Sequence, residues 1–302
     1  MRALSFDRTS DSTALGPGVK VRTVRTSSGE TFRMETVDVH QVDAARRNAL
    51  RDQLLEIQLR GFRAPGHPSH MDRDTQARVE DYIDGCLNTD KHDAFNTVAV
   101  IFSGARAVCD FHAYMGRRRI AGKAVRIVGG NVTTVPSFRG RGLTRYAVNA
   151  VFARFILRHL LSRHATYVAP ICMSPVSYSL LHRIWPRAYP SPTVEPSTEV
   201  LRIYDEVFPG VRAQGGLLRE RAASRVDDST RAFIEASDDP FIRFFMERNP
   251  RFEEGFVLPM VLPFGVRDAF HGSRFLLARS LRQALRTSLG IHRQGSKPAA
   301  RR

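Results

Sequence analysis

The chain has 302 residues, enough for one large domain or two smaller ones, and its 42% apolar and 25% charged residues exclude wholesale disorder. It contains no run of about eighteen apolar residues, so we expect no conventional transmembrane helix. Residues 1–10 lack the apolar segment of a signal peptide. Three cysteines at no metal-like spacing favour reduced thiols in a cytoplasmic protein: Cys86, Cys109 and Cys172.

The charge of the chain is high and unevenly distributed. Lys and Arg number 46 against 30 Asp and Glu, a formal net charge of +16. No acidic residue follows Asp268, and the basic residues beyond it carry half of the excess. The other half, spread over the preceding residues, is compatible with an anionic ligand.

The first part of the chain predicts alternating strands and helices. Residues 1–18 are rich in small polar residues and predict a flexible leader. Alternating apolar residues over 19–24 and 31–39 indicate a hairpin or two edge strands. Helical spacing predicts helices over 43–59 and 72–87, the second capped by Asp72 or Asp74. Strands are expected over 97–102, 107–114 and 125–135, with a basic turn over 117–123.

The rest of the chain is predicted to begin with a buried helix over 142–163, apolar on more than one face. A strand over 167–172 and a helix over 176–184 follow, and a proline-rich stretch ends near residue 196. Beyond it we expect a strand over 199–204 and helices near 228–236, 240–248 and 273–289. This order predicts an α/β or α+β domain whose long helix follows the third central strand.

The segment from Val132 to Tyr146 contains the residues that indicate a binding function. It combines a strand, a proline, a turn with two glycines and the start of a helix. A helix start presents unpaired N–H groups and the positive end of the helix dipole, and glycines allow a ligand to approach closely. No carboxylate occurs between Asp110 and Glu195, so we expect the arginines of the turn to lack local partners. The segment therefore predicts a phosphate or pyrophosphate site, with a plain strand-to-helix turn as the alternative.

This segment resembles the acetyl-CoA-binding motif of the GNAT superfamily of N-acetyltransferases, Gln/Arg-x-x-Gly-x-Gly/Ala. Arg139 and Gly142 occupy its first two positions, and Thr144 stands where Gly or Ala is usual. Residues 174–184 resemble the family's Asn-Pro-x-x-x-x-Leu-Tyr helix, with Leu181 at the tyrosine position. The two motifs cover roughly residues 95–190.

The resemblance implies a mixed, mostly antiparallel sheet flanked by helices and splayed between strands 125–135 and 167–172. The domain would span 19–195, with a C-terminal extension over 196–272 packing on it and a basic helix and tail over 273–302. The co-substrate would be acetyl-CoA or another acyl-CoA, and no metal is expected. Its pantetheine arm would pair with the backbone of Thr133, Thr134 and Val135. Its pyrophosphate would bind the amides of Arg139, Gly140, Arg141, Gly142, Leu143 and Thr144.

Direct attack of an amine on a thioester requires a base for the amine proton and an acid for the departing thiolate. Tyr178, one helical turn before Leu181, and the neighbouring His182 are candidates for the acid. Asp110 shares a strand face with His112 and could supply the base. Each of these side chains could instead be structural, and Cys172 could be an acyl carrier or an unactivated buried thiol.

The sequence therefore predicts a CoA-dependent acyltransferase, most simply an N-acetyltransferase, acting on an amine of unknown identity. One alternative is a GNAT-like binding module without turnover, which Thr144 and Leu181 favour. Another is a basic protein that binds nucleic acid or a membrane surface. The predicted C-terminal helix could dock on the domain or rest on an anionic surface. Its apolar stripe is Leu277, Leu281, Ala284, Leu285 and Leu289.

Overall fold

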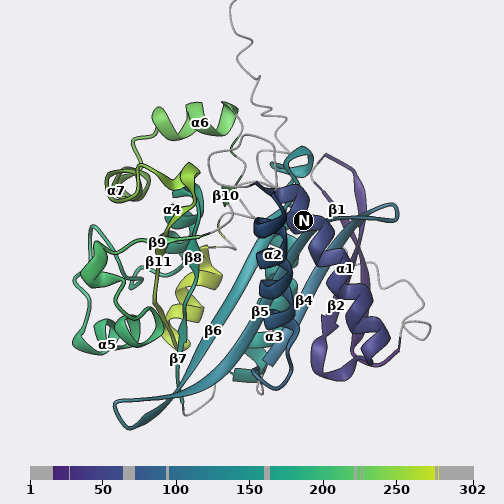
Figure 1. Ribbon diagram of the computed structural model, residues 1–302, viewed down its shortest axis with the longest axis horizontal. Helices are drawn as coiled ribbons and strands as arrows, with labels where there is room; N and C mark the ends of the chain where they lie inside the picture. Colours follow the sequence, from purple (N-terminus) through teal and green to yellow (C-terminus); the bar gives the residue numbers. More distant parts are fainter. Residues whose placement is uncertain are drawn as a thin grey trace, which may run out of the picture.

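The computed structural model describes residues 16–26, 28–63, 72–92, 95–159, 164–220, 223–224, 226, 228–275 and 278. A seven-stranded sheet forms its centre, in the order β1–β2–β4–β5–β6–β7–β12 (Figure 1). All neighbouring strands are antiparallel except β6 and β7, which are parallel. This confirms the predicted mixed, mostly antiparallel sheet. Its strands are β1 (Val19–Arg25), β2 (Thr31–Asp38), β4 (Phe95–Ser103), β5 (Arg106–Ile120), β6 (Lys123–Thr134), β7 (Ala165–Val168) and β12 (Leu262–Phe264).

Helices cover both faces of the sheet. Helices α1 (Ala44–Gly61) and α2 (Arg73–Leu87) lie in front of it in Figure 1, and α3 (Leu143–His159) lies behind it. Strand β4 is buried on both sides because its residues alternate between the two layers. Val98 and Val100 pack with α1 and α2, whereas Ala99 and Ile101 pack with α3.

Most predicted elements of this domain are confirmed, and local capping explains where two of the helices begin. The side chain of Asp43 accepts a hydrogen bond from the Arg46 N–H, and that of Asp72 accepts one from the Thr75 N–H. The predicted hairpin is β1–β2, and the helix over 176–184 is α4 (Pro175–Ile184).

Two predictions about residues 117–172 are wrong. The basic residues Arg117–Arg119 are part of β5, which pairs with β6 without a break as far as Ile120 and Lys123. Only Ala121 and Gly122 form the turn, both with positive φ. The single strand over 167–172 is two strands in different sheets, β7 and β8 (Ile171–Cys172), because the chain leaves β6 at Pro170, which has no N–H to donate.

The strand expected over 199–204 is instead a helix, α5 (Thr198–Val207). Ser197 caps it by accepting from the Val200 N–H. One face of this helix is buried and carries Val200, Ile203 and Tyr204. Over so short a segment, this helical spacing of apolar residues can be mistaken for the alternation of a strand.

Residues 256–264 form two strands that the sequence did not predict. Strand β12 pairs with β7 and becomes the last strand of the main sheet, and β11 (Phe256–Pro259) pairs with β8 and β9 (Leu218–Arg219).

None of the described helices is both long and apolar enough to cross a bilayer. The remaining elements are β3 (Phe62–Arg63), β10 (Ala223–Ser224), α6 (Asp228–Glu235) and α7 (Pro240–Arg248).

The two ends of the chain are described only in part. Residues 266–275 and 278 are helical, and the rest of the predicted basic helix over 273–289 lies outside the described residues. The predicted leader lies outside them too, except for residues 16–18.

Candidate functional site

Strand β6 has an open edge along its second half. It pairs with β7 only over Val125–Val128, and the last bond of this pairing runs from the Ala169 N–H to the Val128 carbonyl, 2.8 Å. The chain then turns away toward β8, while β6 continues to Thr134 paired with β5 alone among the described strands. The sheet is therefore splayed between the two predicted strands.

The register of β5 and β6 decides which backbone groups face this opening. The Val135 N–H donates to the Val108 carbonyl at 3.0 Å, and the pairing stays in phase along the strand. In an antiparallel ladder the bonded residues alternate, so Gly130 and Val132 direct their N–H and C=O groups toward the open edge. The expectation that Thr133 and Val135 would offer their backbone to a ligand is corrected, since both face β5.

Two glycines of β6 lie where β5 and β6 pack closely, beside the open edge. A Cβ on Gly130 would lie 2.5 Å from the His112 carbonyl oxygen, and one on Gly129 would lie 2.5 Å from the Tyr114 ring. A side chain at position 130 would force the backbone to move, because its neighbour there is another backbone atom. The Gly129–Gly130 pair thus permits β5 and β6 to approach closely beside the opening.

The open edge leads directly to a turn and the start of α3. Gly140 and Gly142 both have φ of +77°, a conformation that side chains disfavour. The first N–H groups of α3 have no acceptor within the helix and lie at the positive end of its dipole. The strand, the glycine turn and the start of the helix therefore follow one another in the order that the motif predicts.

The arginines of the turn are arranged differently from one another. The Arg139 Nε–H donates to the Thr134 carbonyl at 3.3 Å, which places its guanidinium over the end of β6. Arg141 forms an ion pair with Glu30 and lies 4.8 Å above the Phe138 ring. These arginines are expected to lack local partners, and the carboxylate that pairs with Arg141 is indeed distant in the sequence: Glu30, from the first hairpin.

Thr144, the departure from the family pattern, has a structural partner. Its hydroxyl lies 2.9 Å from that of Thr134, and the Thr134 hydroxyl donates to the Cys109 Sγ at 3.2 Å. The Thr144 hydroxyl is therefore the donor to Thr134. This series of hydrogen bonds joins the first turn of α3 to β6 and directs the Thr144 hydroxyl toward the sheet.

Asp110 and His112 share a face of β5, as predicted, and both are buried. The His112 Nε2 bonds to the Asn96 Oδ1 at 2.8 Å, and burial lowers the pKa of His112 to about 3, so its ring is neutral. Asp110 is 1% exposed, and its Oδ1 has no hydrogen-bond partner among the described residues. Burial raises the pKa of this carboxyl well above its usual range. Asp110 lies opposite Thr133, one strand away from the open edge.

Tyr178 and His182 are both bound to the carbonyl of Pro190. The Tyr178 hydroxyl donates to it at 2.7 Å, and the His182 Nε2–H donates at 2.9 Å. Burial raises the pKa of Tyr178 and lowers that of His182 to about 4. These contacts give both side chains a structural role in holding the loop after α4.

Cys172 and the residue that precedes α4 also have structural contacts. The Cys172 thiol is buried, donates to the Met260 Sδ at 3.3 Å and has a raised pKa because of burial, so it is poorly suited to act as a nucleophile. Ser174 caps α4 by accepting from the Ser177 N–H.

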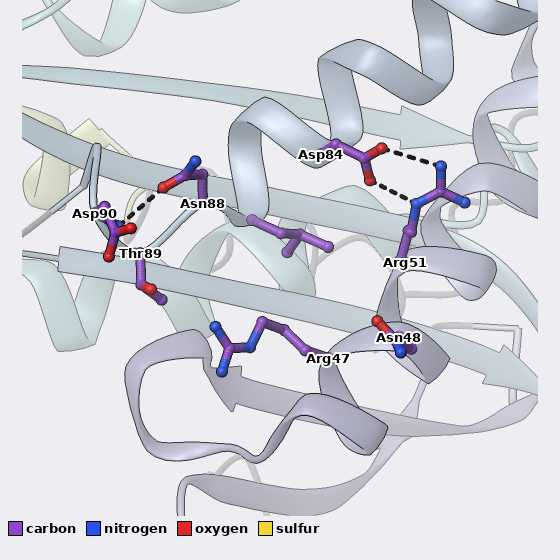
Figure 2. A pocket seen from close by; sticks show the side chains of 8 residues that line it. Arg47, Asn48, Arg51, Asp84, Asn88, Thr89 and Asp90 are labelled. Carbon is purple, nitrogen blue, oxygen red and sulfur yellow. Dashed lines mark hydrogen bonds and ion pairs between the residues drawn. The ribbon is translucent and has the colours of Figure 1, made fainter.

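A polar cavity of about 320 Å³ lies elsewhere, between the start of α1 and the end of α2 (Figure 2). Arg51 forms an ion pair there with Asp84, with the Arg51 Nε 2.5 Å from the Asp84 Oδ1. The opposite end of α1 approaches the open edge, since a Cβ on Gly61 would lie 2.4 Å from the Thr133 Cγ2. We therefore do not assign this cavity to the site.

No family model and no curated protein sequence matches the chain. Among solved structures it is similar to a GCN5-related N-acetyltransferase from Kribbella flavida, at 18% identity and a TM-score of 0.31, over 48% of this chain and 31% of that chain. The mixed sheet, flanked by helices and splayed beside β6, is the arrangement that the resemblance in the sequence implies. A GNAT family acetyltransferase from Brucella melitensis, solved with acetyl-CoA, aligns at 14% identity over 45% of this chain and 74% of its own, TM-score 0.28. The GNAT domain of S. lividans PAT aligns at 11% identity over 81% and 97%, TM-score 0.32.

Proposed function

We propose that this protein transfers an acyl group from acyl-CoA to an amine by direct attack on the thioester. The observation that carries the proposal is the continuity of the site: the open edge of β6 runs into the Gly140–Gly142 turn and the start of α3. An extended pantetheine arm would add to this edge like a strand, bonded to the backbone of Gly130 and Val132. The pyrophosphate would then reach the N–H groups of the turn.

The chemistry follows from that placement. A backbone N–H on the open edge would polarise the thioester carbonyl as the amine nitrogen attacks it. The new C–N bond forms as the C–S bond breaks, and CoA leaves as the thiol after it gains a proton. The amine proton passes to solvent, because burial raises the pKa of Asp110 and keeps this carboxyl protonated, one strand away from the open edge. Tyr178 and His182 have no part in this scheme because Pro190 holds both.

Calorimetric titration with CoA tests the proposal. Wild type is expected to bind CoA, and Arg139→Glu combined with Gly142→Glu is expected to abolish binding, since it places two carboxylates at the phosphate turn. Arg202→Glu, on the exposed side of α5, is a control that also reverses a charge. Absence of binding by wild type, or unchanged binding by the double variant, would refute the proposal.

A second experiment separates an enzyme from a binding module. Release of free thiol from acetyl-CoA and longer acyl-CoAs is measured across a panel of amines. Turnover above background supports the acyltransferase, and CoA binding without any turnover assigns the chain as a module. In the sequence, Thr144 favours the binding module because it departs from the family pattern. In the structure its hydroxyl is directed toward Thr134 and away from the turn, so the structure adds no support for the module.

A further inference from the structure

The helix over 266–275 buries one side against the domain. Asp268 and Ala269 are buried, and the Asp268 carboxylate accepts from the Arg187 Nε at 3.0 Å. Gly272, one turn later, lies against Ile184 of α4, where an added Cβ would be 3.0 Å from the Ile184 Cγ2. These contacts at three- and four-residue spacing fix which side of the helix faces the protein.

The opposite side of this helix exposes apolar side chains. Phe270 is 70% exposed and Val266 is 60% exposed, the highest values for large apolar residues in the described part of the chain. They are four residues apart and so lie one above the other on one face. Because Asp268 and Gly272 hold the other side, this face cannot turn inward without breaking the contact with Arg187.

The same face is flanked by positive charge. Arg267, His271 and Arg274 are all exposed, and no acidic residue follows Asp268. In the sequence the apolar spacing continues at Leu277 and Leu281, which lie outside the described residues. We call the described part, Val266, Arg267, Phe270, His271 and Arg274, the basic apolar face.

We infer that the basic apolar face docks on a membrane surface containing anionic lipids. Exposed aromatic and aliphatic side chains flanked by arginines suit the boundary between headgroups and acyl chains. Each Arg near such a surface adds electrostatic attraction. A second copy of the chain fits less well, because it would bring two strongly basic C-terminal segments together. A soluble polyanion would use the arginines and leave the apolar pair in water. The inference is independent of the proposed acyl transfer.

Co-sedimentation of the full-length protein with vesicles tests the inference. We expect binding to phosphatidylglycerol–phosphatidylcholine vesicles at low salt and little binding to phosphatidylcholine alone. Val266→Glu combined with Phe270→Glu should weaken partitioning about 10-fold or more while leaving the melting temperature unchanged, because both residues are exposed. Arg267→Gln with Arg274→Gln should weaken it about 30-fold. Phe233→Glu, at a residue 56% exposed on α6, is the matched control and should partition like wild type.

A spectroscopic probe distinguishes insertion from electrostatic adsorption. In Phe270→Trp, the new indole emission should shift to the blue when anionic vesicles are added. Three results would overturn the inference: wild type that stays in the supernatant, a Val266→Glu/Phe270→Glu variant that sediments like wild type, or an indole emission of Phe270→Trp that vesicles leave unchanged. A vesicle-independent dimer that the double variant dissociates would also overturn it, in favour of a second copy.

Discussion

Arg141, in the glycine turn before α3, forms an ion pair with Glu30, although 111 residues separate them in the sequence. Two more contacts join the same segments. The Tyr146 hydroxyl donates to the Arg25 carbonyl at 2.8 Å, and the Phe32 and Phe138 rings meet edge to face at 6.2 Å. The end of the first hairpin is thus part of the wall of the proposed CoA site.

Glu30→Gln should strengthen CoA binding at low salt by up to about 5-fold, because the phosphates would no longer compete with this carboxylate for Arg141. Stability should change by less than about 1 kcal/mol, since both side chains are partly exposed. Titration at low and high salt measures the effect, which should fade as salt rises. Glu206→Gln, exposed on α5, makes the same change in net charge and should not alter CoA affinity. Weaker binding by Glu30→Gln would instead show that Glu30 orients Arg141 for the ligand.

Gly130→Ala should destabilise the protein by about 1–3 kcal/mol and weaken CoA binding. The added Cβ would meet the His112 carbonyl, so β5 and β6 would have to separate beside the open edge. Chemical denaturation gives the free energy of unfolding. Gly85→Ala is the control: it lies in α2 with nothing within 4 Å of the new Cβ, and it should stabilise by up to about 1 kcal/mol. A neutral Gly130→Ala would contradict the observed strand packing.

Tyr178→Phe tests whether this tyrosine is structural. Loss of its bond to the Pro190 carbonyl should cost about 0.5–1.5 kcal/mol, a modest value because His182 still donates to the same oxygen. Turnover in the amine assay should be unchanged. A fall in kcat of about 100-fold or more, without a comparable loss of stability, would restore Tyr178 as the acid.

Asp110→Asn should make the protein more stable at neutral pH without lowering its activity. The folded state holds this carboxyl protonated, whereas the unfolded chain releases its proton above about pH 4. Wild-type stability therefore falls as pH rises from the unfolded toward the raised folded pKa, and asparagine removes that loss. Melting curves from pH 4 to neutral pH should show the two proteins converging at the acid end. Activity should stay near that of wild type, because a carboxyl that is protonated in the folded state cannot take the amine proton. A fall in activity of about 100-fold or more would instead assign that role to Asp110.

Local features of the sequence were sufficient for much of this fold. Capping by Asp43 and Asp72, apolar alternation in the first hairpin and the two glycines before α3 each depend on residues a few positions apart. The geometry of the glycine turn before α3 could be predicted for the same reason, since helix geometry and glycine conformation are properties of a short segment.

Tertiary structure decided everything that depends on distant partners. Glu30 became a partner of Arg141 only when the first hairpin packed beside α3, and β12 became a strand because β7 offered it an edge. The backbone groups that face the opening were set by the register of β5 against β6, and the protonation of Asp110 by the burial of that sheet face under α1 and α2. Hydrogen-bond register and desolvation arise from packing between segments, so neither can be calculated from the spacing of residues along one of them.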